Sequence, residues 1–253
     1  MNEKGFVAVF CVDAYGRNCD RYKERFSSCD FLYAEAFDSV VEYVEHLPQK
    51  KDRVLLLGHN PWFKDKLSPL LKEGASIQEY QELPLRKLDS KYDLIISTGH
   101  LQFVADIDTY MKNLCWALDA GGHIFVSFLG GDSLKELRQA LTTAEQAISG
   151  GSRMRVIPFL QAKEGTAILS ACHLKQPISE KNKLKVMYND MFDLMNDIKG
   201  MYGANILFDR EKHLASKKLF LEASKLYENA FKATDGEGVM ATFEIITLRG
   251  IKP

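Results

Sequence analysis

Apolar residues recur along this chain in two alternating patterns, continuous short runs and stripes with helical spacing. Residues 31–46 place apolar side chains three and four positions apart and stop before Pro48, which predicts an amphipathic helix. A continuous apolar run follows at 54–57 and ends at Gly58, which is typical of a strand buried on both faces of a parallel sheet. The chain therefore begins with an alternation of helix and strand.

Two further apolar runs, at 94–96 and 124–128, continue this alternation. Residues 107–118 between them have helical spacing, so the local order is strand, helix, strand. Gly121 and Gly122 connect the helix to the second of these strands. Such an order is typical of right-handed crossovers between parallel strands.

A long helix is predicted over 134–148. Ser133 precedes it as an N-cap, Glu136 completes a capping box, and Gly150 ends the helix. Other segments extend the pattern. We expect a first strand or core-docking segment over 6–12, a helix over 62–73, a weak strand over 76–80, helices over 189–200 and 213–231, and a C-terminal strand over 239–248.

Together these elements predict an α/β fold, a doubly wound, Rossmann-like sheet with helices on both faces and an antiparallel C-terminal strand. The chain has 253 residues, of which 46% are hydrophobic, enough for one large core. We expect a single domain over 1–253, with an N-terminal helical segment over 1–50 and a helical insertion or lid over 185–235. Because 59–91 is short for two crossovers, the second strand is expected to be missing or shortened.

Composition excludes several classes of function. The net charge of −1 leaves no excess of positive charge to bind a nucleic-acid backbone. The five cysteines contain no C-x-x-C pair, which disfavours a disulfide framework and a zinc site. His59, His100 and His123 lack the spacing of metal ligands. With no long apolar stretch and no signal or transit peptide, we expect a cytoplasmic protein without a metal or a membrane span.

Seven segments stand in the order of motifs in one known superfamily. They are VLLLG at 54–58, KYDLIIST at 91–98, LCWALDAGGHIFVSF at 114–128, GGDSLKELR at 130–138, GGSRMRVIPF at 150–159, LMNDIKGMYGANILFDR at 194–210 and ATFEIITLRGIKP at 241–253. These segments resemble class I S-adenosylmethionine (SAM) methyltransferases. The resemblance is strongest to the branch of malonyl-ACP O-methyltransferase, an enzyme of biotin synthesis, and the methyltransferase-like mitochondrial complex I assembly factor, an arginine hydroxylase.

The resemblance implies a SAM site at the carboxyl end of the first strand. There, glycines let the backbone approach the cofactor, and an acidic side chain after the second strand binds the ribose. This chain keeps Gly58 of the expected G-x-G-x-G, but Asn60 and Trp62 stand at the other glycine positions and Pro61 removes a backbone donor. We therefore expect impaired SAM binding at a site made of Gly58, His59, Asn60, Thr98 and Gly99.

A substrate cleft is also implied by the resemblance. The family passage L-x-W-x-x-D, commonly with His before the Trp, appears here as LQFVAD at 101–106. Asp106 matches and Phe103 keeps an aromatic ring, but Gln102 replaces the His and cannot act as an acid or a base. No catalytic residue is assigned. Glu79 and Glu82 are either a replacement for the ribose-binding acid or surface charge. The expected cleft residues are Gln102, Phe103, Asp106, Arg138, Arg155 and Tyr188.

Three functions remain open. The degenerate loop favours a methyltransferase-fold pseudoenzyme that serves in assembly or binding. The alternatives are an active SAM-dependent methyltransferase acting on a carrier-bound carboxylate, and an assembly factor resembling the protein arginine hydroxylase. The expected partner is a protein, either a carrier protein or a respiratory-complex subunit. Lys175 and the lysines within 181–185 form a basic patch that fits an acidic partner, or they guard a solvated strand edge.

Overall fold

The computed structural model describes residues 10–59, 62–210, 216–233 and 236–253. Contacts between residues group the chain into two compact units. The single domain expected from the sequence stays a prediction. The sheet unit contains Asp30–Gly130, Leu160–Asn182 and Ile245–Pro253, and the helical unit contains the residues up to Cys29, Gly131–Phe159 and Lys183–Glu244.

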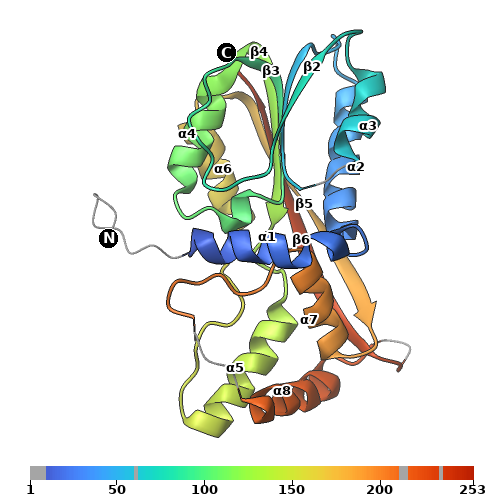
Figure 1. Ribbon diagram of the computed structural model, residues 1–253, viewed down its shortest axis with the longest axis vertical. Coiled ribbons are helices and arrows are strands. Elements are labelled where there is room, and N and C mark those ends of the chain that lie inside the picture. Colours follow the sequence, from blue (N-terminus) through green and yellow to red (C-terminus); the bar gives the residue numbers. More distant parts are fainter. Residues whose placement is uncertain (1–9, 60–61, 211–215, 234–235) are drawn as a thin grey trace. The chain divides into compact units, whose positions relative to one another are not determined.

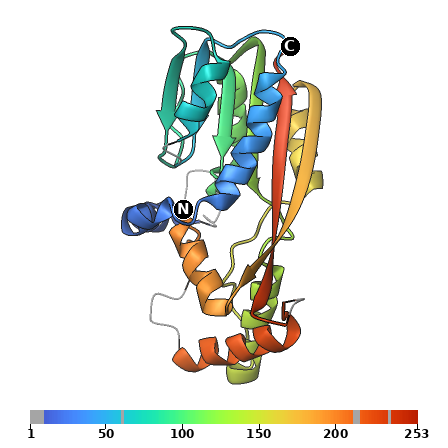
Figure 2. The ribbon, with the colours of Figure 1, turned by 90° about the vertical axis from the view of Figure 1, so that its right-hand side faces the viewer.

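A six-stranded sheet has the strand order β2-β1-β3-β4-β6-β5. Strands β2, β1, β3 and β4 pair in parallel, and β6 pairs with β4 in the antiparallel direction. Figures 1 and 2 show the two long strands β5 and β6 side by side. The predicted α/β class and antiparallel C-terminal strand are confirmed. The strands are β1 Arg53–Leu57, β2 Ser76–Tyr80, β3 Tyr92–Thr98, β4 Leu118–Leu129, β5 Lys175–Tyr188 and β6 Val239–Ile251.

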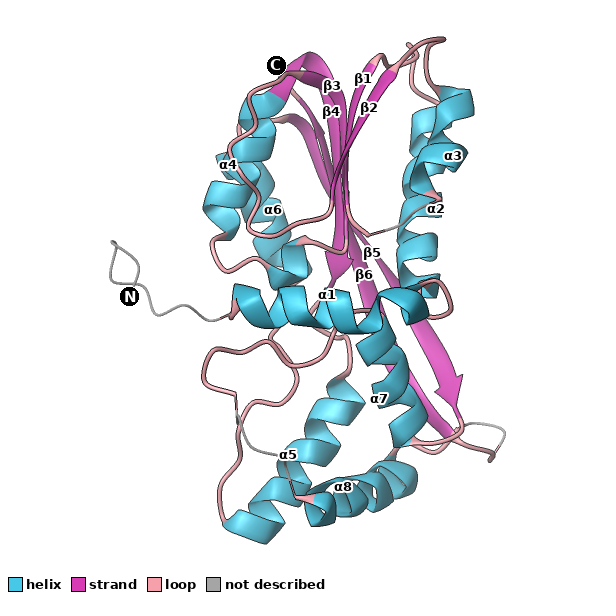
Figure 3. Cartoon of the chain, viewed as in Figure 1, coloured by secondary structure: helices cyan, strands magenta, loops and turns pink. Residues whose placement is uncertain are grey.

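Helices cover both faces of the sheet in the sheet unit. Helices α2 (Phe31–Glu45) and α3 (Phe63–Leu67) lie on one face, and α4 (Ile107–Ala117) and α6 (Ala162–Ala171) lie on the other (Figures 1 and 3). The cause is the alternation of side chains along each strand, since successive residues point to opposite faces. In β1, Val54 and Leu56 pack in one core with helix α2, whereas Leu55 and Leu57 pack in the other with α4.

The second strand is present and short. Strand β2 pairs with the full length of β1, from Arg53 opposite Ser76 to Leu57 opposite Tyr80. In a doubly wound sheet of order 3-2-1-4, the neighbour of the first strand on this side is the second strand. The strand is therefore not missing, as the sequence had allowed, and its predicted shortening stays a prediction. Among the described residues, no strand lies outside β2, where the order 3-2-1-4 has its third strand.

The helical unit contains α1 (Val12–Phe26), α5 (Lys135–Ser149), α7 (Met191–Gly200) and α8 (Lys217–Ala230). Helix α1 packs on α7, and α5 packs on α8, which lies beside it in Figure 2. The Phe26 and Tyr202 rings stack with centroids 4.7 Å apart, which joins the end of α1 to the segment after α7. None of the described helices is long and apolar enough to cross a membrane.

The capping box predicted for α5 is wrong. Leu134 is the N-cap residue, with a φ of 56°. The Ser133 hydroxyl donates to the Glu244 carbonyl over 3.1 Å, and Glu136 accepts from the backbone N–H and the hydroxyl of Thr242. Partners from β6 thus satisfy the two side chains that the sequence assigns to the helix end. The predicted end of the helix is confirmed, because Gly150 has a φ of 72° and donates to Gln146.

Other boundaries differ for local reasons. The helix predicted over 62–73 is shorter, since Pro69 lies in a 3-10 turn, Ser68–Leu70, that follows α3. Helix α6 was not predicted. Most of the segment predicted over 6–12 lies outside the described residues, and Val12 begins a helix. Strand β5, which carries the lysines, lies at the sheet edge, as the strand-edge interpretation predicts.

Candidate functional site

The carboxyl ends of β1 and β3 lie side by side and meet at Gly58. This residue has a φ of 145°, and a Cβ atom added to it would lie 2.7 Å from the Thr98 carbonyl oxygen. Its N–H donates to the Tyr80 carbonyl of β2 over 3.0 Å. Glycine is therefore required here for the close approach of the strand ends, and its backbone donor is already used within the sheet.

An aromatic ring covers the backbone of Gly99. The residue has a φ of 75°, and a Cβ atom added to it would overlap the ring of Tyr33, whose Cδ1 atom lies 2.6 Å from that position. Tyr33 belongs to α2 and is buried. The Gly99 N–H donates to the Ser127 carbonyl over 2.8 Å. At this point the bare backbone faces a protein ring.

Two histidines extend the same end of the sheet. The His59 and His100 rings lie edge to face with centroids 5.7 Å apart. Burial lowers the pKa of His59 to about 4. Burial, together with the neighbouring His59, lowers the pKa of His100 to about 3, and the nearby Gln81 carbonyl counters this only in part. Both imidazoles are neutral at pH 7.

Buried polar atoms in this group lack partners. By distance and angle, neither the ring nitrogens of His100 nor the Thr98 hydroxyl makes a hydrogen bond with the described residues, although both side chains are almost fully buried. The Gln81 carbonyl lies close enough to act on the His100 pKa, but it does not meet hydrogen-bond geometry. Unpaired buried polar groups are uncommon and cluster at functional sites. The end of β3 therefore has the chemical character of a ligand site, with neutral donors and acceptors.

The Trp62 ring turns toward the helix layer. Its Nε1–H donates to the Asp30 carboxylate over 2.7 Å, and its edge contacts Phe37 of α2 and Phe63 of α3. The sequence left the orientation of Trp62 open, and the structure shows that partners at the start of α2 and within it hold the ring. Asn60, another predicted cofactor residue, lies outside the described residues.

The two acids considered for the ribose lie at the surface. Strand β2 ends at Tyr80, where a doubly wound fold carries its ribose-binding acid. Glu79 is exposed on β2, and Glu82 forms an exposed ion pair with Arg86 at 3.8 Å. Their arrangement supports the interpretation as surface charge.

No family model matches the chain. The chain is 34% identical over 165 residues to the mitochondrial arginine-hydroxylase NDUFAF5 of Dictyostelium discoideum. The matched region makes up 65% of the chain and 38% of that protein. It is 27% identical over 140 residues to the malonyl-[acyl-carrier protein] O-methyltransferase of Xylella fastidiosa, covering 55% of the chain and 45% of the relative. The chain thus spans less than half the length of these relatives.

A solved structure shares the fold. Phosphoethanolamine N-methyltransferase 2 of Haemonchus contortus, in complex with S-adenosyl-L-methionine, superposes with a TM-score of 0.50 and 14% identity, over 99% of the chain and 61% of that protein. The chain has the fold of the class I methyltransferases. The resemblance predicted from the sequence motifs is confirmed at this level.

Three of the predicted cleft residues lie in the sheet unit of this methyltransferase-fold chain. The Gln102 side-chain oxygen accepts the Leu129 N–H over 2.8 Å. Asp106 caps α4 by accepting from the Thr109 N–H at 3.0 Å and the Thr109 hydroxyl at 2.8 Å. Phe103 is buried. These contacts account for the three side chains without a substrate.

The other three lie in the helical unit of the methyltransferase-fold chain. Arg138 donates to the Ser133 carbonyl over 3.4 Å, and burial lowers its pKa. The Tyr188 hydroxyl donates to Asp197 over 2.8 Å, and burial followed by this bond raises the tyrosine pKa. Arg155 forms an ion pair with Glu145 at 2.6 Å. The assignment of all six residues to a substrate cleft stays a prediction.

Sequence reasoning missed Tyr33 and Asp30. Tyr33 lies off the apolar stripe that predicts the helix, so the pattern carries no sign of its contact with Gly99. Asp30 resembles an ordinary residue at a helix start, and its bond to Trp62 exists only in the folded chain. Within the described ranges, no group of three or more His, Cys, Asp or Glu side chains could hold a metal ion.

Proposed function

We propose that this chain is a methyltransferase-fold protein that has lost conventional SAM binding and works by binding a partner protein, as an assembly factor. The contact between Tyr33 and Gly99 carries the proposal. A SAM site needs accessible backbone at the carboxyl ends of the first and fourth strands of the doubly wound order, which correspond to β1 and β3 here. At the end of β3, the buried ring of Tyr33 lies on the backbone of Gly99.

Two further observations support impaired binding. The Gly58 N–H donates to Tyr80, so it is not directed at a ligand. The candidate acids Glu79 and Glu82 are exposed, and Glu82 is paired with Arg86. These contacts support a site in which the residues described at this end of the sheet do not hold SAM.

A partner-binding role is supported by the motifs that the chain retains. The segments 130–138 and 150–159 keep the pattern of the assembly-factor and carrier-methyltransferase branch, although the cofactor loop does not. The partner we propose is an acidic protein surface, such as that of a carrier protein or a respiratory-complex subunit, which would meet the lysines of β5. Relatives named NDUFAF5 are mitochondrial proteins, and a cytoplasmic location for this chain stays a prediction.

A second candidate function is that of an active SAM-dependent enzyme, either a methyltransferase on a carrier-bound carboxylate or a protein arginine hydroxylase. The unpaired polar atoms of Thr98 and His100 favour it, because they require an explanation that packing does not supply. A ligand bound at the end of β3 would provide one.

Calorimetric titration of the whole chain with SAM and with S-adenosylhomocysteine separates the two candidates. The proposal expects no saturable heat with either compound. The malonyl-[acyl-carrier protein] O-methyltransferase relative, titrated under the same conditions, is the positive control. Micromolar binding of either compound to the chain would overturn the proposal and favour the enzyme.

A further inference from the structure

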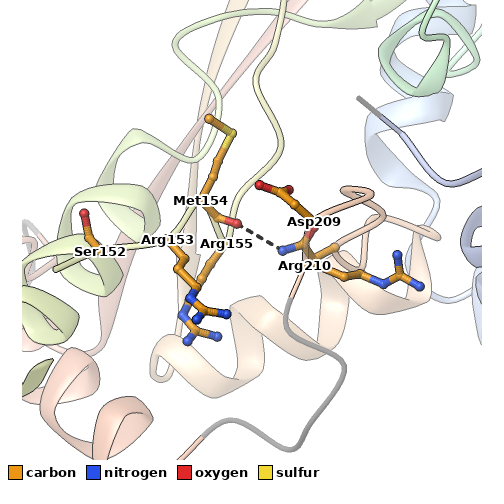
Figure 4. A pocket seen from close by; sticks show the side chains of 7 residues that line it. Ser152, Arg153, Met154, Arg155, Asp209 and Arg210 are labelled. Carbon is orange, nitrogen blue, oxygen red and sulfur yellow. Dashed lines mark hydrogen bonds between the residues drawn. The ribbon is translucent and has the colours of Figure 1, made fainter. Parts of the chain in front are cut away.

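A cavity in the helical unit lies apart in sequence from the residues discussed for SAM. Its volume is about 330 Å³, at the lower end of the range for small-molecule sites. Two segments form its walls, the loop that follows α5 and the segment that follows α7 (Figure 4). The lining residues are Ser152, Arg153, Met154, Arg155, Asn205, Asp209 and Arg210.

The walls are joined by a hydrogen bond. The Asn205 side-chain amide donates to the Met154 carbonyl over 3.3 Å, which is the dashed line in Figure 4. The Asn205 side-chain oxygen also accepts from the Leu207 N–H over 2.9 Å. One side chain thus links the two segments that form the walls.

Glu145 positions the cationic side of the cavity. Its carboxylate accepts from the Arg155 guanidinium at 2.6 and 3.3 Å and from the Arg153 backbone N–H at 2.9 Å. The hydrogen bond from Arg155 lowers the Glu145 pKa, burial opposes this, and the bond from the Arg153 N–H lowers the pKa further. The Glu145 pKa is lowered overall, so the carboxylate is charged. Arg155 is therefore held in one orientation.

The charges leave a positive surplus. In Figure 4 the side chains of Arg153 and Arg155 extend in the same direction, whereas that of Arg210 points away from them and donates to the Leu207 carbonyl over 2.8 Å. Glu145 balances Arg155, but the Arg153 guanidinium makes no hydrogen bond or ion pair with the described residues. Two guanidinium groups on one side of a cavity match the oxygen geometry of an oxyanion.

We propose that this cavity binds a small phosphate monoester, with its phosphate on Arg153 and Arg155. A phosphate offers three oxygens to two guanidinium groups, more than a carboxylate does. Asp209 also lines the cavity, and its carboxylate lies away from the two guanidinium groups in Figure 4. Asp209 accepts a hydrogen bond from an ammonium or hydroxyl group on the rest of the ligand. This phosphate site goes beyond the proposed assembly role, and the two proposals can be tested independently.

Titration calorimetry with the whole chain tests this site, with phosphoserine, inorganic phosphate and succinate as probes. We expect phosphoserine to bind saturably and more tightly than succinate. Arg153→Gln should weaken phosphoserine binding by roughly tenfold, which corresponds to about 1.4 kcal/mol. Arg17→Gln removes an equal charge from an exposed position of α1 and should leave binding unchanged.

Asp209→Asn distinguishes the two parts of the ligand. It should weaken phosphoserine binding but not phosphate binding, because only phosphoserine carries an ammonium group. Equal binding of succinate and phosphoserine would overturn the assignment of phosphate. Equal losses in Arg153→Gln and Arg17→Gln would overturn the site, since the effect would then come from overall charge. Thermal unfolding of each variant, with a melting temperature close to that of the parent, shows that the variants are folded.

Discussion

The Tyr33 ring of α2 lies against the backbone of Gly99, at the point where β3 ends. The contact has two consequences. It joins a helix to the carboxyl end of the sheet, and it covers the backbone of Gly99, which the sequence predicts as a cofactor-binding residue. The contribution of this contact to the stability of the protein can be measured with single substitutions.

Gly99→Ala should destabilise the protein more than Gly121→Ala does. Both glycines have nearly the same positive φ, 75° and 72°, so both variants incur similar backbone strain. A Cβ atom at Gly99 meets the Tyr33 ring, whereas at Gly121 nothing lies within 4 Å. We expect a loss of about 1 kcal/mol for Gly121→Ala and of more than about 3 kcal/mol for Gly99→Ala in urea unfolding. Equal losses would show that Tyr33 moves aside freely.

The stability of the protein should fall as the pH drops below about 6.5. Burial lowers the pKa of His100 to about 3 and that of His59 to about 4, from the usual 6.5. Between these values the unfolded chain takes up protons that the folded chain does not, so the free energy of unfolding decreases on acidification. The slope is at most about 1.4 kcal/mol per pH unit for each histidine.

His100→Phe should make this pH dependence shallower, because the variant has one buried histidine fewer. The control is His173→Asn at an exposed position whose φ of 53° asparagine tolerates. Urea unfolding at pH 7 and pH 5 measures the difference. If the two variants and the parent lose equal stability between these pH values, His100 is not a source of the effect.

Asp106 should behave as a helix cap. Asp106→Ala removes the acceptor for the Thr109 N–H and should cost about 1 kcal/mol of stability, while Asp106→Asn keeps a capping oxygen and should cost little. Chemical denaturation measures both variants. A large loss of stability in Asp106→Asn would indicate that the negative charge itself is needed. It would contradict the role of Asp106 as a simple helix cap.

The bond between Trp62 and Asp30 should appear as a coupling energy. Trp62→Phe and Asp30→Ala each remove the hydrogen bond, so the double variant should lose less stability than the sum of the single variants. We expect a coupling of about 1–2 kcal/mol in urea unfolding, since the acceptor is a carboxylate. A coupling near zero would mean that the indole N–H finds water equally well.

Periodicity was sufficient for the order of the main elements. The stripe over 31–46 and the run at 54–57 became α2 and β1, and the weak strand predicted over 76–80 became β2. These patterns could be interpreted because strand and helix periods depend on neighbouring residues only. The motifs after residue 90 likewise predicted the resemblance to class I methyltransferases.

The roles of single side chains were decided by tertiary structure. Glu136 and Ser133 have the residue types of a capping box, yet they bind Thr242 and Glu244, which are more than 100 residues away. Tyr33 covers Gly99 only because α2 packs beside the end of β3. Sequence by itself determined most of the helices and strands, although not α6, and the resemblance of the chain to class I methyltransferases. What each polar or aromatic group touches was set by long-range packing, because hydrogen bonds and ring contacts form wherever folding brings a partner within reach, whatever the distance along the chain.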